Sequence, residues 1–200
     1  MARSRGILYF APEIPYSEVR IDDDEIISQF RDRLVGFYLQ PAKQLIASET
    51  IFAAGVLVIC CMDALSRYDV DYHRFTKHCD RFPKWMAGEL RSFKGDEKLA
   101  IRFYKAFRCG LVHEARIKYV GEFSLDTKRT VTLYGNFFVI NPYLLLDEVI
   151  DALNRFVSKF IGDNAFGQRF KAEMWKDFEG HFPAPKRSLL LARTGKVQGR

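Results

Sequence analysis

The apolar run Ile51–Met62, which reads IFAAGVLVICCM, decides the fold of this chain. It is apolar on nearly every face of a helix, and a helix of that kind has to be surrounded by other helices. Ser48 or Thr50 can cap its start, and we expect it to continue to about Tyr68. The apolar run is too short to span a bilayer. It therefore predicts the central helix of a mainly α-helical protein.

The segments before and after this run also carry helical patterns. A first helix is expected over residues 22–40, because apolar residues recur at helical spacing behind an acidic first turn. It should end or bend at Pro41, with a short helical continuation to Ala47. Residues 72–93 are predicted to be helical, with a break before Pro83. These segments would supply the neighbours that the central helix needs.

Three more helices are expected toward the C-terminus. Residues 97–107 form one of them, with Asp96 as its cap. Asn141 followed by proline is a strong helix start, and apolar residues at helical spacing continue the helix to Gly162. A shorter amphipathic helix is expected over residues 166–178. Together these patterns predict a helical bundle.

Residues 115–140 have a different pattern, in which apolar and polar residues alternate. This alternation predicts a small antiparallel β-hairpin insertion in the helical body. Asp126–Arg129 should turn the chain into a strand that begins at Val131, and Phe137–Ile140 is a further strand. Near the N-terminus, the apolar residues 7–10 are followed by two prolines, which indicates an extended arm or an edge strand.

Composition favours one domain with a charged tail. The chain has 200 residues, of which 48% are hydrophobic, so residues 1–183 can bury one core. The net charge is +6, and five basic residues without an acid fall in residues 184–200, which we expect to form a flexible tail. A basic tail can add affinity for a polyanion, although most such tails are only solvated.

Cysteine usage and the N-terminal residues predict a cytoplasmic protein. The four cysteines form no CxxC pair and no disulfide framework, and residues 1–20 lack the pattern of a signal peptide. His73, His78 and Cys79 fit no common zinc spacing, so we interpret both histidines as surface or hydrogen-bonded residues. The sequence predicts no metal, no cofactor and no membrane anchor, and it contains no P-loop, G-x-G-x-x-G or H-E-x-x-H motif.

The functional residues that we single out begin at Arg108 and end at His113. An arginine can hold a phosphate through two hydrogen bonds, and a histidine can exchange a proton near neutral pH. Gly110, between them, could loosen or kink the helix. Asp63 follows the central apolar run, so its carboxylate either reaches solvent or is held by a cation. An arginine partner would make Asp63 an orienting residue.

The text FYKAFRCGLVHE, Phe103–Glu114, resembles the R-x(4 to 6)-H motif of the HEPN superfamily, the higher eukaryotes and prokaryotes nucleotide-binding domain. The resemblance implies an up-and-down helical bundle and a metal-independent endoribonuclease, as in toxins or defence proteins. It implies that two copies of His113 and Arg108 meet in a homodimer, with the histidine as general acid or base and the arginine on the phosphate. Asp63 and Cys109 are the possible orienting residues. A regulatory partner such as an antitoxin would accompany a toxin.

Two alternatives remain open. In active family members the position that Cys109 occupies is often polar, and a thiol is a weak hydrogen-bonding group. This favours a non-catalytic HEPN-like dimer that binds a nucleotide or a protein. In the other alternative, Arg108 is paired with Asp63 inside the bundle and His113 only caps a carbonyl. Lys105 and Arg116 could guide an RNA strand, although such residues are usually only solvated.

Overall fold

The computed structural model describes residues 8–118 and 120–181, and within them the side chains of Val112 and His113 are not described. The predicted basic tail lies outside the described residues. The protein is mainly helical, as the sequence predicts. Its α-helices are α1 (Glu25–Leu34), α2 (Gln40–Ala47), α3 (Ile51–Tyr68), α4 (His78–Glu89), α5 (Glu97–Phe103), α6 (Cys109–Glu114), α7 (Pro142–Gly162) and α8 (Asn164–Phe178). Single 3₁₀ turns form η1 (Tyr16–Glu18), η3 (Val70–Tyr72), η4 (Arg91–Phe93) and η6 (Glu179–His181).

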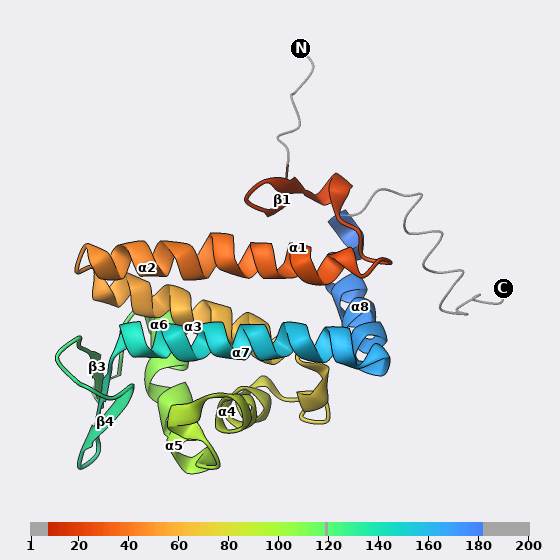
Figure 1. Cartoon of the computed structure of the whole chain (residues 1–200). Helices are drawn as coiled ribbons and strands as arrows, with labels where there is room; N and C mark the ends of the chain where they lie inside the picture. Colours follow the sequence, from red (N-terminus) through yellow and green to blue (C-terminus); the bar gives the residue numbers. More distant parts are fainter. Residues whose placement is uncertain (1–7, 119, 182–200) are drawn as a thin grey trace.

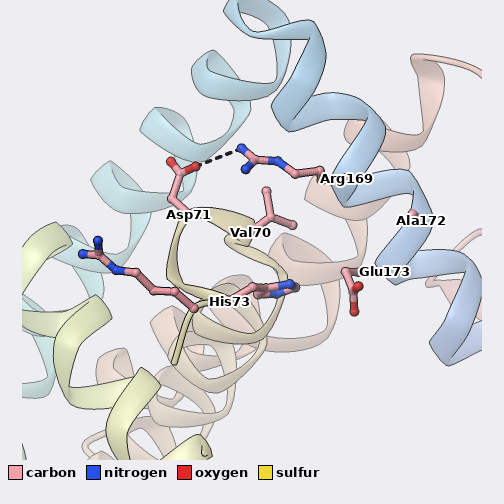
Figure 2. Close-up of a pocket in the computed structure, with 7 residues that line it drawn as sticks. Val70, Asp71, His73, Arg169, Ala172 and Glu173 are labelled. Atoms are coloured by element: carbon pink, nitrogen blue, oxygen red, sulfur yellow. Dashed lines mark hydrogen bonds and ion pairs between the residues drawn. The ribbon is translucent and has the colours of Figure 1, made fainter. Parts of the chain in front are cut away.

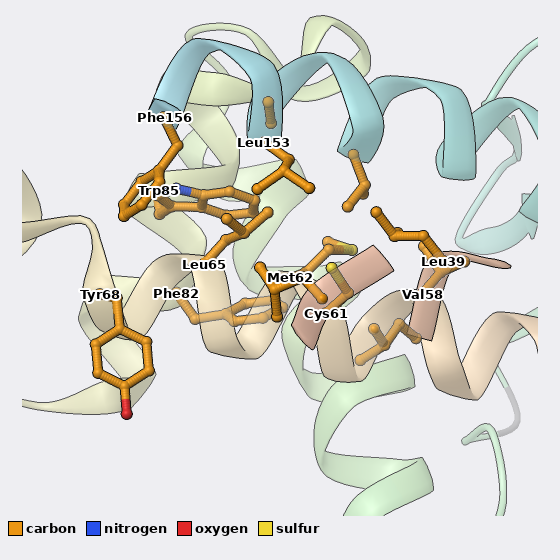
Figure 3. Packing of buried hydrophobic residues seen from close by; sticks show 14 of the residues in the cluster. Leu39, Val58, Cys61, Met62, Leu65, Tyr68, Phe82, Trp85, Leu153 and Phe156 are labelled. Atoms are coloured by element: carbon orange, nitrogen blue, oxygen red, sulfur yellow. The ribbon is translucent and has the colours of Figure 1, made fainter. Parts of the chain in front are cut away.

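Helix α3 is the centre of the bundle, and its bounds agree with the prediction. In Figure 1 the helices α1 and α2 run along one side of α3 and α7 runs along another. Figure 3 shows the resulting core, where Met62 and Leu65 of α3 meet Trp85 of α4 and Leu153 of α7. Of the described helices, α3 is also the one that is long and apolar enough to cross a membrane. Half of it is buried among other helices, as in the core helix of a globular domain.

The first helical segment continues through Pro41, contrary to the end or bend expected there. α1 leads through a π turn, η2 (Val35–Leu39), directly into α2, which extends to Ala47 as expected. Proline cannot donate the backbone hydrogen bond that an α-helix requires one turn back. The wider π turn lies where that bond would be missing, so the helix continues through the proline.

Helix α4 also differs from its prediction. It begins at His78, and it passes through Pro83 without a break. The N–H that Pro83 lacks would have bonded to Cys79 in the first turn of the helix. Only that one bond is lost, and the buried proline ring packs in the core.

The small sheet has three strands, in the order β3 (Gly121–Phe123), β5 (Phe137–Ile140), β4 (Val131–Tyr134). The antiparallel hairpin is confirmed for β4 and β5, which are joined by a two-residue turn. Gly135 starts this turn with φ of +61°, a backbone conformation that tight hairpin turns use. A second, two-stranded sheet pairs β1 (Tyr9–Ala11) with β2 (Ile14–Pro15), which agrees with the extended N-terminal arm.

The hairpin turn predicted at Asp126–Arg129 is wrong. β3 pairs with β5 in parallel, so β5 lies between the two strands that this turn was expected to join. The segment is instead held as a loop by Asn141, whose amide nitrogen donates to the carbonyl oxygens of Leu125 (3.3 Å) and Thr127 (2.8 Å). One asparagine thus caps α7 and fixes the loop beside the sheet.

Candidate functional site

The predicted motif lies on one continuous helix built from α5, a π turn η5 (Tyr104–Arg108) and α6. Asp96 caps its start as predicted, by accepting a hydrogen bond from the Leu99 N–H at 2.9 Å. π turns within α-helices often occur at functional sites. Here the turn contains both Tyr104 and Arg108, and the guanidinium lies 5.9 Å from the centre of the tyrosine ring.

Asp63 of α3 contacts Arg108, which is the pairing that the sequence suggested. The arginine donates from Nε to Oδ1 at 3.4 Å and from Nη2 to Oδ2 at 3.3 Å. The Arg108 side chain is 14% exposed and that of Asp63 is 35% exposed. The pair is therefore at the edge of the bundle and not sealed inside it. A two-point contact of this kind fixes the plane of the guanidinium.

His78, the first residue of α4, shares the same carboxylate. Its Nε2 lies 2.5 Å from Asp63 Oδ1, and its Nδ1 lies 3.3 Å from the Tyr104 hydroxyl. The sequence interpretation had His78 as a surface or hydrogen-bonded histidine, and its place beside Arg108 was missed. We call Asp63, His78, Tyr104 and Arg108 the Asp63 cluster. Three helical elements, α3, α4 and η5, meet in it.

The charges of the Asp63 cluster follow from its contacts. Burial raises the pKa of Asp63, but the hydrogen bonds and charges of His78 and Arg108 outweigh burial, so the pKa lies below its usual value. Burial lowers the pKa of Arg108, and Asp63 more than reverses that effect. Burial and the neighbouring Cys109 raise the pKa of Tyr104 to about 12. At neutral pH the carboxylate and the guanidinium are therefore charged, and the tyrosine can donate to His78.

A second cation lies one turn along α4 from His78. Arg81 Nε is buried, and within the described part of the chain it has no hydrogen-bond partner. Burial, followed by the charge of Arg67, lowers the pKa of Arg81, while Asp63 opposes that shift. A guanidinium stays charged despite such shifts. Arg81 thus adds positive potential near Asp63.

Gly110 has a different role from the one the sequence suggested. It lies inside the regular helix α6, where the returning chain passes so close that a Cβ would be 2.5 Å from the Arg116 carbonyl oxygen. The Arg116 N–H donates to the Gly110 carbonyl at 3.2 Å, and the Lys118 N–H donates to the Ala106 carbonyl at 3.1 Å. The glycine therefore permits this close approach and does not kink the helix.

The other two predicted site residues also lie on α6. Cys109 is half-buried, packs against the core and neighbours Tyr104. The backbone of His113 lies in the last turn of α6, which ends where Ala115 adopts the left-handed conformation with φ of 53°. The side chain of His113 is outside the described part of the structure, so its approach to Arg108 remains a prediction.

A separate depression of about 460 Å³ lies between η3 and α8 (Figure 2). Two of its charged groups are paired, since Arg169 donates to Asp71 at 3.2 Å. His73 belongs to this region and lies 2.7 Å from the Arg67 carbonyl oxygen, so it is not part of the Asp63 cluster. In residues 8–118 and 120–181, no three His, Cys, Asp or Glu side chains are grouped so that they could hold a metal ion.

Comparisons with protein-family models, with curated proteins and with solved structures found no match for this chain. The geometry of the Asp63 cluster and the sequence of α6 are therefore what supports a functional proposal.

Proposed function

We propose that the protein is a metal-independent endoribonuclease of HEPN type, with an active site that two copies of the chain complete. The observation that carries the proposal is the placement of Arg108. Its guanidinium is fixed by Asp63 at the edge of the bundle, on the same continuous helix as His113. A fixed guanidinium beside a proton carrier is what cleavage of a phosphodiester requires.

The reaction needs two proton transfers and a stabilised phosphorane. A base takes the proton of the ribose 2′-hydroxyl while its oxygen attacks phosphorus, and an acid gives a proton to the departing 5′-oxygen. The products are a 2′,3′-cyclic phosphate and a free 5′-hydroxyl. In this proposal His113 of each copy supplies one proton transfer, and Arg108 binds the phosphate oxygens. Asp63 and His78 act as positioning residues for Arg108 and Tyr104.

A half-exposed apolar stripe on α3 is a candidate interface for the second copy. Phe52 is 47% exposed, and Val56 and Cys60 continue the stripe at intermediate exposure as far as Asp63. An apolar stripe that leads to a charged site is suited to an interface between two copies. In the cytoplasm such a ribonuclease would need restraint, which fits a toxin held by an antitoxin or a defence protein awaiting its trigger.

The test is RNA cleavage by the purified protein in the presence of a metal chelator. We expect fragments with 2′,3′-cyclic phosphate ends. R108A should reduce the rate about 10²–10³-fold, and H113A should reduce it about 10²–10⁴-fold. R91A, which removes an exposed arginine of η4, is the matched control and should cut like the wild type. Equal cutting by H113A and R91A would exclude His113 from the mechanism.

One observation favours the non-catalytic alternative. Asp63 neutralises Arg108, and both ring nitrogens of His78 are engaged by neighbours. A cluster of this kind can also serve as a nucleotide- or protein-binding site in a HEPN-like dimer. This alternative predicts no cleavage at any pH, together with a rise in melting temperature when a nucleotide or a partner is added.

A further inference from the structure

A groove of about 340 Å³ lies where η5 meets the small sheet. Arg102, Lys105 and Lys118 line it, and none of the described residues that line it is acidic. Its floor includes Phe138 and Ala106. We propose that this groove binds the phosphate backbone of single-stranded RNA and leads the strand to Arg108. The inference rests on the proposed ribonuclease function and names the path of its substrate.

The cations of the groove are only partly neutralised. Arg102 donates to the Asn136 carbonyl at 3.0 Å and covers the Phe138 ring at 4.5 Å, and among the described residues its side chain has no ion pair with an acid. Lys105 is exposed, and no ion pair of its side chain occurs among the described residues. Lys118 pairs with Glu114 at 2.7 Å, but that carboxylate is shared with Arg116. An excess of positive charge therefore remains along the groove.

The groove and the candidate site share the turn η5. Lys105 and Ala106 belong to η5, the same turn that contains Arg108, and the Lys118 N–H bonds to the Ala106 carbonyl. Lys105 lies three residues before Arg108 in this turn, so the two side chains are neighbours on the helix surface, and in this proposal a strand lying on Lys105 passes next to Arg108. Single-stranded nucleic acid binds in positively charged grooves of this kind, because each neutralised phosphate releases a counterion.

Another basic surface provides a matched comparison. Arg91, Lys94 and Arg155 line a second depression, but Glu89 lies in it and pairs with Arg155 at 3.5 Å. Arg91 faces Asp151 at 3.6 Å, and Lys94 donates to the Gly88 carbonyl. The two surfaces have three basic side chains each, and they differ in that Glu89 lines the second, whereas none of the described residues that line the first is acidic. Only the first borders η5.

The experiment measures the affinity of a labelled single-stranded RNA at several salt concentrations. Every protein carries H113A, so that the RNA stays intact. The groove variant is R102Q/K105Q/K118Q, the control is R91Q/K94Q/R155Q, and a charge-conserving variant is R102K/K105R/K118R. Three lost phosphate contacts should reduce the slope of log K against log salt by about 2. The control and the charge-conserving variants should keep the slope of the H113A parent.

Several results would overturn the groove proposal: no RNA binding by the parent, an equal slope for the groove and control variants, or equally tight binding of an acidic peptide that depends on the same three residues. These results are independent of cleavage. A normal groove effect in a protein that never cuts RNA would refute the ribonuclease and leave the groove standing. Cleavage of RNA by the wild type, together with an unchanged slope for the groove variant, would refute the groove and leave the ribonuclease standing.

Discussion

Asp63 is the residue that joins the candidate site, because its one carboxylate contacts both His78 and Arg108. The folded state lowers its pKa, so the stabilisation from these contacts is present above the pKa of the unfolded state. It is lost as the pH falls through the lower pKa of the folded state. D63N should remove this part of the pH dependence and should also reduce cleavage, since Arg108 loses its partner.

Urea unfolding between about pH 6 and pH 3 tests the first expectation. The wild type should lose more stability over this range than D63N. D147N, which changes an exposed aspartate of α7, is the control and should follow the wild type. If the free energy of unfolding changed equally with pH in the wild type and in D63N, the contacts of Asp63 would contribute no pH-dependent stability.

The sequence could predict one contact of the Asp63 cluster and not the others. Asp63 directly follows an apolar run, and a carboxylate in that place needs a cation, so Arg108 could be named as its partner. His78 offered no comparable signal, since it lies 15 positions from Asp63 and 26 from Tyr104. Only the fold brings these residues together.

At the scale of elements, α6 depends on Gly110. A methyl group at this position would collide with a backbone carbonyl, which cannot rotate away as a side chain can. G110A should therefore destabilise the fold by about 1–3 kcal/mol and reduce cleavage by displacing α6.

The matched control for G110A is G162A at the end of α7, where a Cβ meets no atom within 4 Å. This variant should be neutral or stabilise the fold by up to about 1 kcal/mol, because alanine restricts the unfolded chain. Thermal or urea unfolding of both variants measures the difference. Equal stabilities would contradict the close packing of the returning chain over α6.

Helices whose signals are local were predictable, and elements set by distant contacts were not. Asn141 caps α7 as expected, with its side-chain oxygen accepting from the N–H groups of Tyr143 (3.0 Å) and Leu144 (3.2 Å). The π turns η2 and η5 could not be predicted, because the spacing of apolar residues in the sequence does not distinguish them from an α-helix. The parallel pairing of β3 with β5 is non-local, and alternation within a strand does not identify its partner.

At the scale of the whole molecule, we propose that two copies of the helical bundle form one ribonuclease site. The aromatic core explains why one bundle is stable, because Phe170 makes edge contacts with Phe30 and Phe156, and Phe30 makes an edge contact with Tyr68. In this proposal a second copy supplies the second histidine, because one histidine cannot serve at once as the base and as the acid. We therefore expect that a dimer with only one intact copy of Arg108 and His113 does not cleave RNA efficiently.

The most direct measurement is the single-turnover cleavage rate of a heterodimer with one wild-type subunit and one R108A/H113A subunit, isolated through two different tags. A composite site predicts a rate far below half that of the wild-type dimer, close to the rate of the doubly changed dimer. A rate of half the wild-type value, or full activity in a monomer, would show that each chain holds a complete site. No cleavage by the wild type would contradict the ribonuclease itself.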